Sequence, residues 1–168
     1  MSQQGVPAPS QVLDAISTLA AAQRASGQPA TLFAAVGTAV DRCFGCILFT
    51  VLAYRRSEET LHRLYSNRPD INPVGGSKRM GRTAWTDRVL ERGEAYIGYT
   101  YKDLKAVFAD HETLGSIGCG SVLNMPIVWG GIVHGSLNLL DRPGRFGESD
   151  IPLARTFAQL TLPALLGQ

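Results

Sequence analysis

The sequence has little of what marks a membrane-spanning or secreted protein. No apolar run approaches the ~20 residues that a bilayer requires, and Met1 to Ser10 contain no basic stretch followed by an apolar core, so we expect neither a membrane span nor a secretory signal. The three cysteines are an odd number, which argues against a secreted disulfide framework. We therefore expect a cytoplasmic protein with no membrane partner.

The sequence also has no large excess of positive or negative charge. The 16 basic and 14 acidic residues are mixed along the chain, which leaves a net charge of +2. Nucleic-acid-binding proteins carry a strong basic patch, so nucleic acid is not an expected partner. Cys43 and Cys46 form a C-x-x-C pair without a second pair, and His62, His111 and His134 are scattered. We expect no metal, no cofactor and buried, inert thiols.

What the chain does have is the length and apolar content of one globular domain. It has 168 residues, of which 45% are hydrophobic. Residues 1–9 carry two prolines and no periodic pattern, and we expect them to be disordered. Residues 10–168 are expected to form a single domain.

Periodicity and turn signals divide this domain into helices and hairpin-connected strands. Such an order predicts an α+β fold with an antiparallel sheet. The expected elements are helices over 10–27, 29–42, 83–92, 102–109, 111–117 and from 149 onward, strands over 46–54, 60–66, 95–99, 121–129 and 132–141, and a long loop over 67–82.

Three short motifs make the chain similar to a known family. Ser121 to Ile127 reads Ser-x-Leu-x-hydrophobic-Pro-hydrophobic, the next strand contains Gly135-Ser-Leu, and Phe146-Gly-Glu-Ser-Asp150 precedes the final helix. With the order of elements, these motifs make the chain from about Gln28 to the C-terminus resemble a GAF domain.

The resemblance implies a fold and a function class. The five expected strands, numbered along the chain, would lie in the order 2-1-5-4-3. The N- and C-terminal helices would cover one face of the sheet, and short helices and loops would roof a ligand cavity on the other. A GAF domain of this size is expected to be a small-molecule-binding sensor, and the family's habit of pairing terminal helices implies a homodimer.

The resemblance also indicates which face of the last two strands looks into the cavity. Because side chains alternate along a strand, Asn124 on one strand and His134, Ser136 and Asn138 on its partner share that face. A buried amide without a partner costs about 1–3 kcal/mol. The two amides therefore either bond each other or the backbone, or they orient a polar ligand.

Two further groups are candidates for the ligand site. A basic loop runs from Gly75 into a helix start capped by Thr83, where Arg82 or Arg79, together with the Thr83 hydroxyl, could hold a carboxylate or phosphate. The alternative is a solvated loop. Trp85 and Phe108 fall in the expected roof, as cavity walls or as ordinary core. The ligand is expected to be small and polar or anionic.

An enzyme is the main alternative. A related group of small GAF proteins reduces free methionine sulfoxide with cysteine thiols, but Gly115 and Val122 stand where that group has its nucleophilic cysteine and its glutamate. Cys119 is displaced by four residues from the cysteine position. His111 is the remaining acid–base candidate, and a cap is its structural alternative. A third possibility is a domain without ligand that only pairs with partners.

Overall fold

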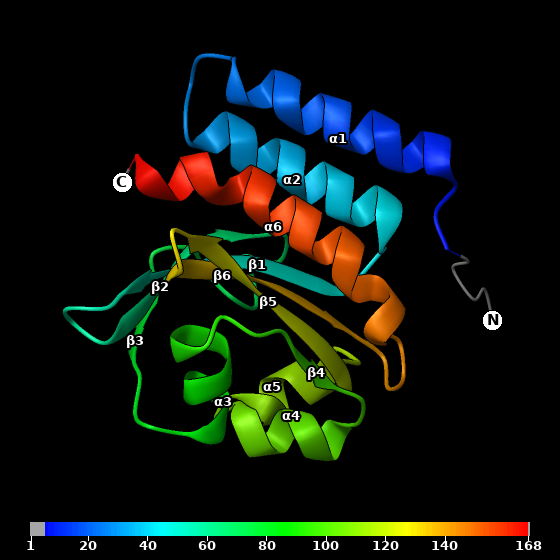
Figure 1. Cartoon of the computed structure of the whole chain (residues 1–168). Coiled ribbons are helices and arrows are strands. Elements are labelled where there is room, and N and C mark those ends of the chain that lie inside the picture. Colours follow the sequence, from blue (N-terminus) through cyan, green and yellow to red (C-terminus); the bar gives the residue numbers. More distant parts are fainter. Residues whose placement is uncertain (1–5, 168) are drawn as a thin grey trace.

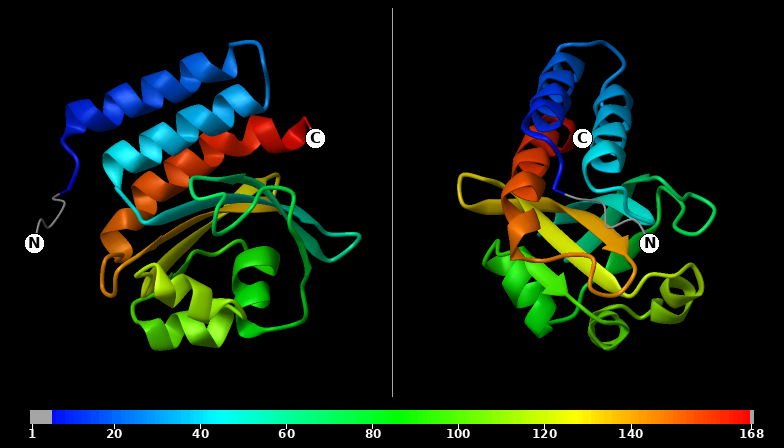
Figure 2. Two further views of the ribbon diagram at one scale, coloured as in Figure 1. Left: turned by 180° about the vertical axis from the view of Figure 1, so that it is seen from behind. Right: turned by 90° about the vertical axis from the view of Figure 1, so that its right-hand side faces the viewer.

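The protein is built in three layers, as the computed structural model of residues 6–167 shows (Figure 1). Three long helices lie above one face of a sheet, with α1 farthest from it, and short helices lie below the other face. The views of Figure 2 show the same layers. The long helices are α1 (Pro9–Gln23), α2 (Ala30–Cys43) and α6 (Ile151–Leu166), and the short ones are α3 (Ala84–Thr86), α4 (Tyr101–Val107) and α5 (His111–Ser116).

The sheet has six antiparallel strands in the order β3-β2-β1-β6-β5-β4. The predicted order 2-1-5-4-3 is confirmed for the five expected strands. The segment 67–82 was expected to be a loop throughout, but residues near its end form the edge strand β3. The strands are β1 (Leu48–Arg55), β2 (Thr60–Ser66), β3 (Ser77–Arg79), β4 (Tyr96–Gly98), β5 (Ser121–Trp129) and β6 (Ile132–Asp141).

Alternation along the central strands sends side chains into two separate layers. On β1, Phe49 and Val51 join the main core beneath the long helices, whereas Leu48 and Leu52 face the short helices. Gly135 on β6 faces α6, and a Cβ there would overlap the backbone oxygen of Leu52 and lie 2.7 Å from Cδ2 of Leu165. The sheet is therefore covered closely above and more loosely below.

A β-bulge changes the face to which β2 side chains point. The pairing of β1 with β2 shifts between Val51, which lies opposite Tyr65, and Leu52, which lies opposite Arg63, so Leu64 has no partner. The centroid of the Tyr65 ring lies 5.7 Å from the centroid of the Phe49 ring, in the layer of the long helices. Arg63 faces the layer of the short helices.

The helix ends differ from expectation in two places. A proline inside a helix usually kinks or ends it, yet α6, the last helix, continues past Pro163 to Leu166. α1 begins at Pro9, inside the N-terminal segment expected to be disordered. Positions 1–5 of that segment lie outside the described residues. Among residues 6–167, no helix has both the length and the apolar character of a membrane span.

Candidate ligand cavity

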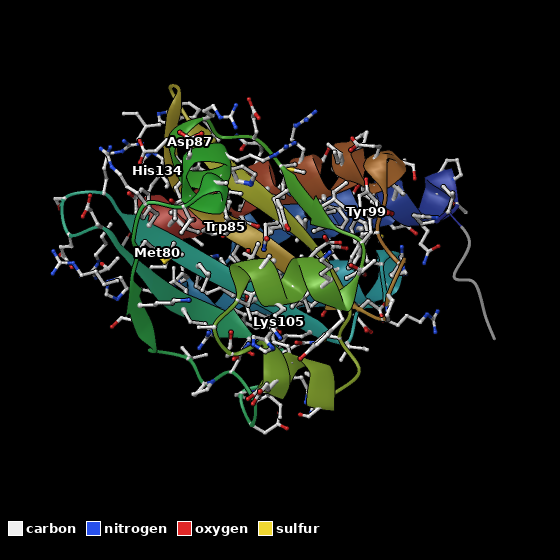
Figure 3. The ribbon with its side chains drawn as sticks, turned by 90° about the horizontal axis from the view of Figure 1, so that it is seen from below. Met80, Trp85, Asp87, Tyr99, Lys105 and His134 are labelled. Carbon is white, nitrogen blue, oxygen red and sulfur yellow. The ribbon has the colours of Figure 1, made fainter. Side chains whose placement is uncertain are left out.

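A cavity of about 380 Å³ lies between the lower face of the sheet and the short helices. Viewed from the side of the short helices, as in Figure 3, the floor of the cavity comes from β1, β2 and β6, and one wall comes from β3 and the residues on either side of it. The roof comes from Trp85, the end of α4, the segment that joins α4 to α5, and α5. The floor residues are Leu48, Thr50, Leu52, Leu61, Arg63, Asn138 and Leu140; the wall is Asn72, Gly76, Ser77, Lys78 and Met80; the roof is Trp85, Val107, Phe108, Ala109, Asp110 and Leu114.

The tryptophan of the roof is tied to the floor by buried amides. Thr83 caps the short helix that carries Trp85, since its hydroxyl accepts from the Thr86 amide at 3.1 Å. Trp85 Nε1 donates to Asn124 Oδ1 at 3.0 Å, and Asn124 Nδ2 donates to Asn138 Oδ1 at 2.6 Å. In Figure 3, seen from the side of the short helices, Trp85 lies over the middle of the sheet.

The same network extends across the floor to β1. Ser136 Oγ donates to Asn138 Oδ1 at 3.1 Å, and Asn138 Nδ2 donates to Thr50 Oγ1 at 3.3 Å. The carboxamide of Asn138 thus uses its oxygen and its nitrogen within the protein. The two amides bond each other, which was one of the alternatives left open by the sequence.

The eight residues proposed from the sequence are distributed over three places. Trp85, Phe108 and Asn138 line the cavity, and Asn124 and Ser136 lie fully buried behind its surface. The remaining three are not part of the cavity lining: half-buried His134 lies near the start of β6, and Arg82 and Thr83 line a separate groove of about 540 Å³ beside the β1–β2 hairpin.

The charged residues of the lining were missed in the sequence. They are Arg63, Lys78 and Asp110. Burial lowers the pKa of Arg63, and the Asp110 carboxylate acts in the opposite direction. The available signal was an arginine two residues after Leu61 in a strand that pairs with the buried β1, which places both side chains on one face.

The groups considered for catalysis do not lie in the cavity lining. Burial raises the pKa of Cys46 and of Cys119 to about 12, and Cys43 is buried as well. His111 Nδ1 lies 2.9 Å from the Tyr101 hydroxyl. Gly115, where the related methionine sulfoxide-reducing group has its cysteine, lies against Tyr101, and a Cβ there would be 2.8 Å from the Tyr101 ring.

The described part of the chain also contains no cluster of metal-ligating side chains. Within residues 6–167, no group of three or more His, Cys, Asp or Glu side chains is placed to hold a metal ion.

The family model of the GAF domain matches residues 28–165, and the chain belongs to the GAF family, whose members are small-molecule-binding sensor domains. The resemblance inferred from the strand motifs is thereby confirmed. No curated protein sequence matches the chain.

Solved structures show the same fold at low sequence identity. The GAF domain of a phosphoenolpyruvate-protein phosphotransferase from Coxiella burnetii aligns with a TM-score of 0.77 and 15% identity over 94% of each chain. The corresponding Acinetobacter domain gives 0.75 and 14%, covering 96% of this chain and 95% of that one. A phycoerythrobilin-bound GAF domain from a cyanobacterial phytochrome gives 0.73 and 11%, covering 95% and 97%.

Proposed function

We propose that this protein is a sensor domain that binds a small polar or anionic molecule in the cavity beneath its sheet. The observation that carries the proposal is the cavity itself, about 380 Å³ with an ordered lining in which Trp85 is held to the floor through Asn124 and Asn138. Mostly apolar cavities with a few fixed polar groups are typical of small-molecule sites.

The volume of the cavity suits a small guest. At roughly 30 Å³ for each water-sized group, about 380 Å³ corresponds to about a dozen such groups. The cyanobacterial relative, bound to phycoerythrobilin, supports the use of this fold for ligand binding. Here Trp85 and Phe108 would contact the guest as walls, Asn138 would contact it from the floor, and Asn124 and Ser136 would hold Asn138 in place.

A cavity-filling variant tests the proposal. Val107 is half-buried and lies in the roof. Val107→Trp should fill much of the space and weaken binding of a neutral probe, indole, by roughly tenfold or more, since a bulky side chain displaces the guest. Isothermal titration calorimetry measures the affinity, and native mass spectrometry of the freshly purified protein looks for a co-purified molecule.

The matched control places the same new side chain outside the cavity. Val74 is 55% exposed and does not line it. Val74→Trp should bind indole like the parent protein. If the parent protein binds no indole, carries no co-purified molecule and binds none of the aromatic probes used below, the proposal is wrong.

The alternative of a thiol enzyme makes an opposite prediction about reactivity. Only the thiolate is a good nucleophile, and burial raises the pKa of Cys46 and Cys119 to about 12, so almost no thiolate is present at pH 8. We expect Ellman's reagent to label none of the three cysteines in the folded protein and all three in guanidinium. Rapid labelling of one thiol at pH 8 would support the enzyme.

A sensor also needs an output, and we include a homodimer in the proposal. Helix α1 forms the outermost layer, and its Leu13 side chain is 63% exposed, as a residue at a helix-to-helix contact would be in the free chain. A monomeric mass by light scattering at micromolar concentration would contradict this part.

A further inference from the structure

Two cations in the cavity lining make no salt bridge in the described part of the chain. Arg63 comes from β2 and Lys78 from β3, on neighbouring strands where Lys78 lies opposite Leu61. Among residues 6–167, neither side chain is within salt-bridge distance of a carboxylate. Asp110, across the cavity, is the third charged residue of the lining.

The guanidinium of Arg63 makes only some of the hydrogen bonds that it could donate. Its Nη1 donates to the backbone oxygen of Pro73 at 3.1 Å, whereas its Nε is buried and has no hydrogen-bond partner. A buried donor left unpaired costs about 1–3 kcal/mol. The edge formed by Nε and Nη2 is one of the planar forks that bind both oxygens of a carboxylate.

The opposite part of the lining is apolar. Leu48 and Leu140 lie next to each other on β1 and β6, and Leu114 and Phe108 cover them from the short helices. A guest that reaches from Arg63 to this region would meet a cation at one end and only hydrocarbon at the other. Its own two ends should differ in the same way.

We propose that the cavity takes a small monocarboxylate with a compact apolar body, its carboxylate held by the Nε edge of Arg63 and neutralised further by Lys78. This inference rests on the proposed function, since it names the class of molecule that the sensor binds. The body, aromatic or branched aliphatic, packs against Leu48, Leu140 and Phe108.

The charge of the lining favours one negative charge over two. Arg63 and Lys78 are opposed by Asp110, so the three ionised groups leave a formal charge of +1. A carboxylate matches that charge and the planar fork. A phosphate monoester brings a second charge and a tetrahedral group, and it would meet the Asp110 carboxylate without a further cation.

Two probes of equal shape separate charge from fit. Benzoate and benzamide differ mainly in that benzoate is charged. We expect benzoate to bind at least roughly tenfold more tightly than benzamide, and Arg63→Gln to bring the ratio of the two affinities close to one, because only the charged probe loses an ion pair. Lys78→Gln, at an exposed strand position, should cost benzoate only about two- to threefold. Calorimetry at fixed ionic strength provides all these affinities.

Arg82→Gln is the matched control, because Arg82 is exposed and lines the separate groove. It should leave benzoate binding unchanged. A circular dichroism spectrum and a Tm like those of the parent protein show that Arg63→Gln is folded.

The proposal is overturned if benzoate binds no better than benzamide, if phenyl phosphate binds more tightly than benzoate, or if Arg82→Gln rather than Arg63→Gln abolishes the preference. If benzamide and indole bind but benzoate shows no advantage, only this inference fails. If none of the three binds and no molecule co-purifies, the proposed function fails with it.

Discussion

Gly135→Ala is expected to destabilise the protein by about 4 kcal/mol or more, among the largest effects of a single substitution. Its added methyl group would overlap the carbonyl oxygen of Leu52 on the neighbouring strand and press on Leu165 of α6. Neither the paired backbone nor the helix packed on it can move away cheaply. Urea denaturation followed by circular dichroism measures the loss.

A second glycine controls for the effect of the substitution on the unfolded chain. Gly81 has no atom within 4 Å of where a Cβ would lie, and its backbone is not left-handed. Gly81→Ala should therefore change the free energy of unfolding by less than about 1 kcal/mol. Equal stability of the two variants would mean that β1 and β6 do not pair in the register described.

Asn138→Ala is expected to cost about 3 kcal/mol, because it leaves the buried donors of Asn124 and Ser136 without their shared acceptor. For a chain of this length, that corresponds to a fall in Tm of roughly 6–12 °C. Thermal unfolding in the absence of ligand measures it. No fall in Tm would show that the amide network does not stabilise the fold.

A double-mutant cycle separates the contact between the two amides from the other effects of each substitution. In Asn124→Leu or Asn138→Leu alone, one amide stays buried opposite an apolar group. In the double variant both amides of the 2.6 Å contact are gone. The double variant should therefore be more stable than the sum of the single losses predicts, by about 1–2 kcal/mol. Strict additivity would contradict a direct bond between them.

Much of the fold could be predicted because its signals are local. Gly130-Gly131 between two apolar runs marks the β5–β6 hairpin, and the motifs around Ser121 and Gly135 link it to the family. The edge strand β3 was not predicted, because its three residues follow a segment rich in proline and glycine. Pairing with β2, a tertiary contact, is what orders them.

The candidate site could be predicted only in part, for a similar reason. Alternation along the strands places Asn124 and Asn138 on one face, and the structure pairs them. It does not reveal that Trp85 covers Asn124, which leaves β5 outside the cavity lining. Alternation puts Arg63 on the same face as Leu61, but whether that face looks toward the cavity depends on how β2 pairs with β1, which the sequence of β2 alone does not record.

Because of the bulge, two residues only two positions apart on β2 belong to opposite layers. Arg63 lines the cavity below the sheet. Tyr65 packs beneath the long helices near Gly37 of α2, where a Cβ would clash with the Tyr65 hydroxyl. Only Leu64 separates them. A change of backbone twist at Leu64 would therefore alter how the Arg63 and Tyr65 side chains are oriented relative to each other.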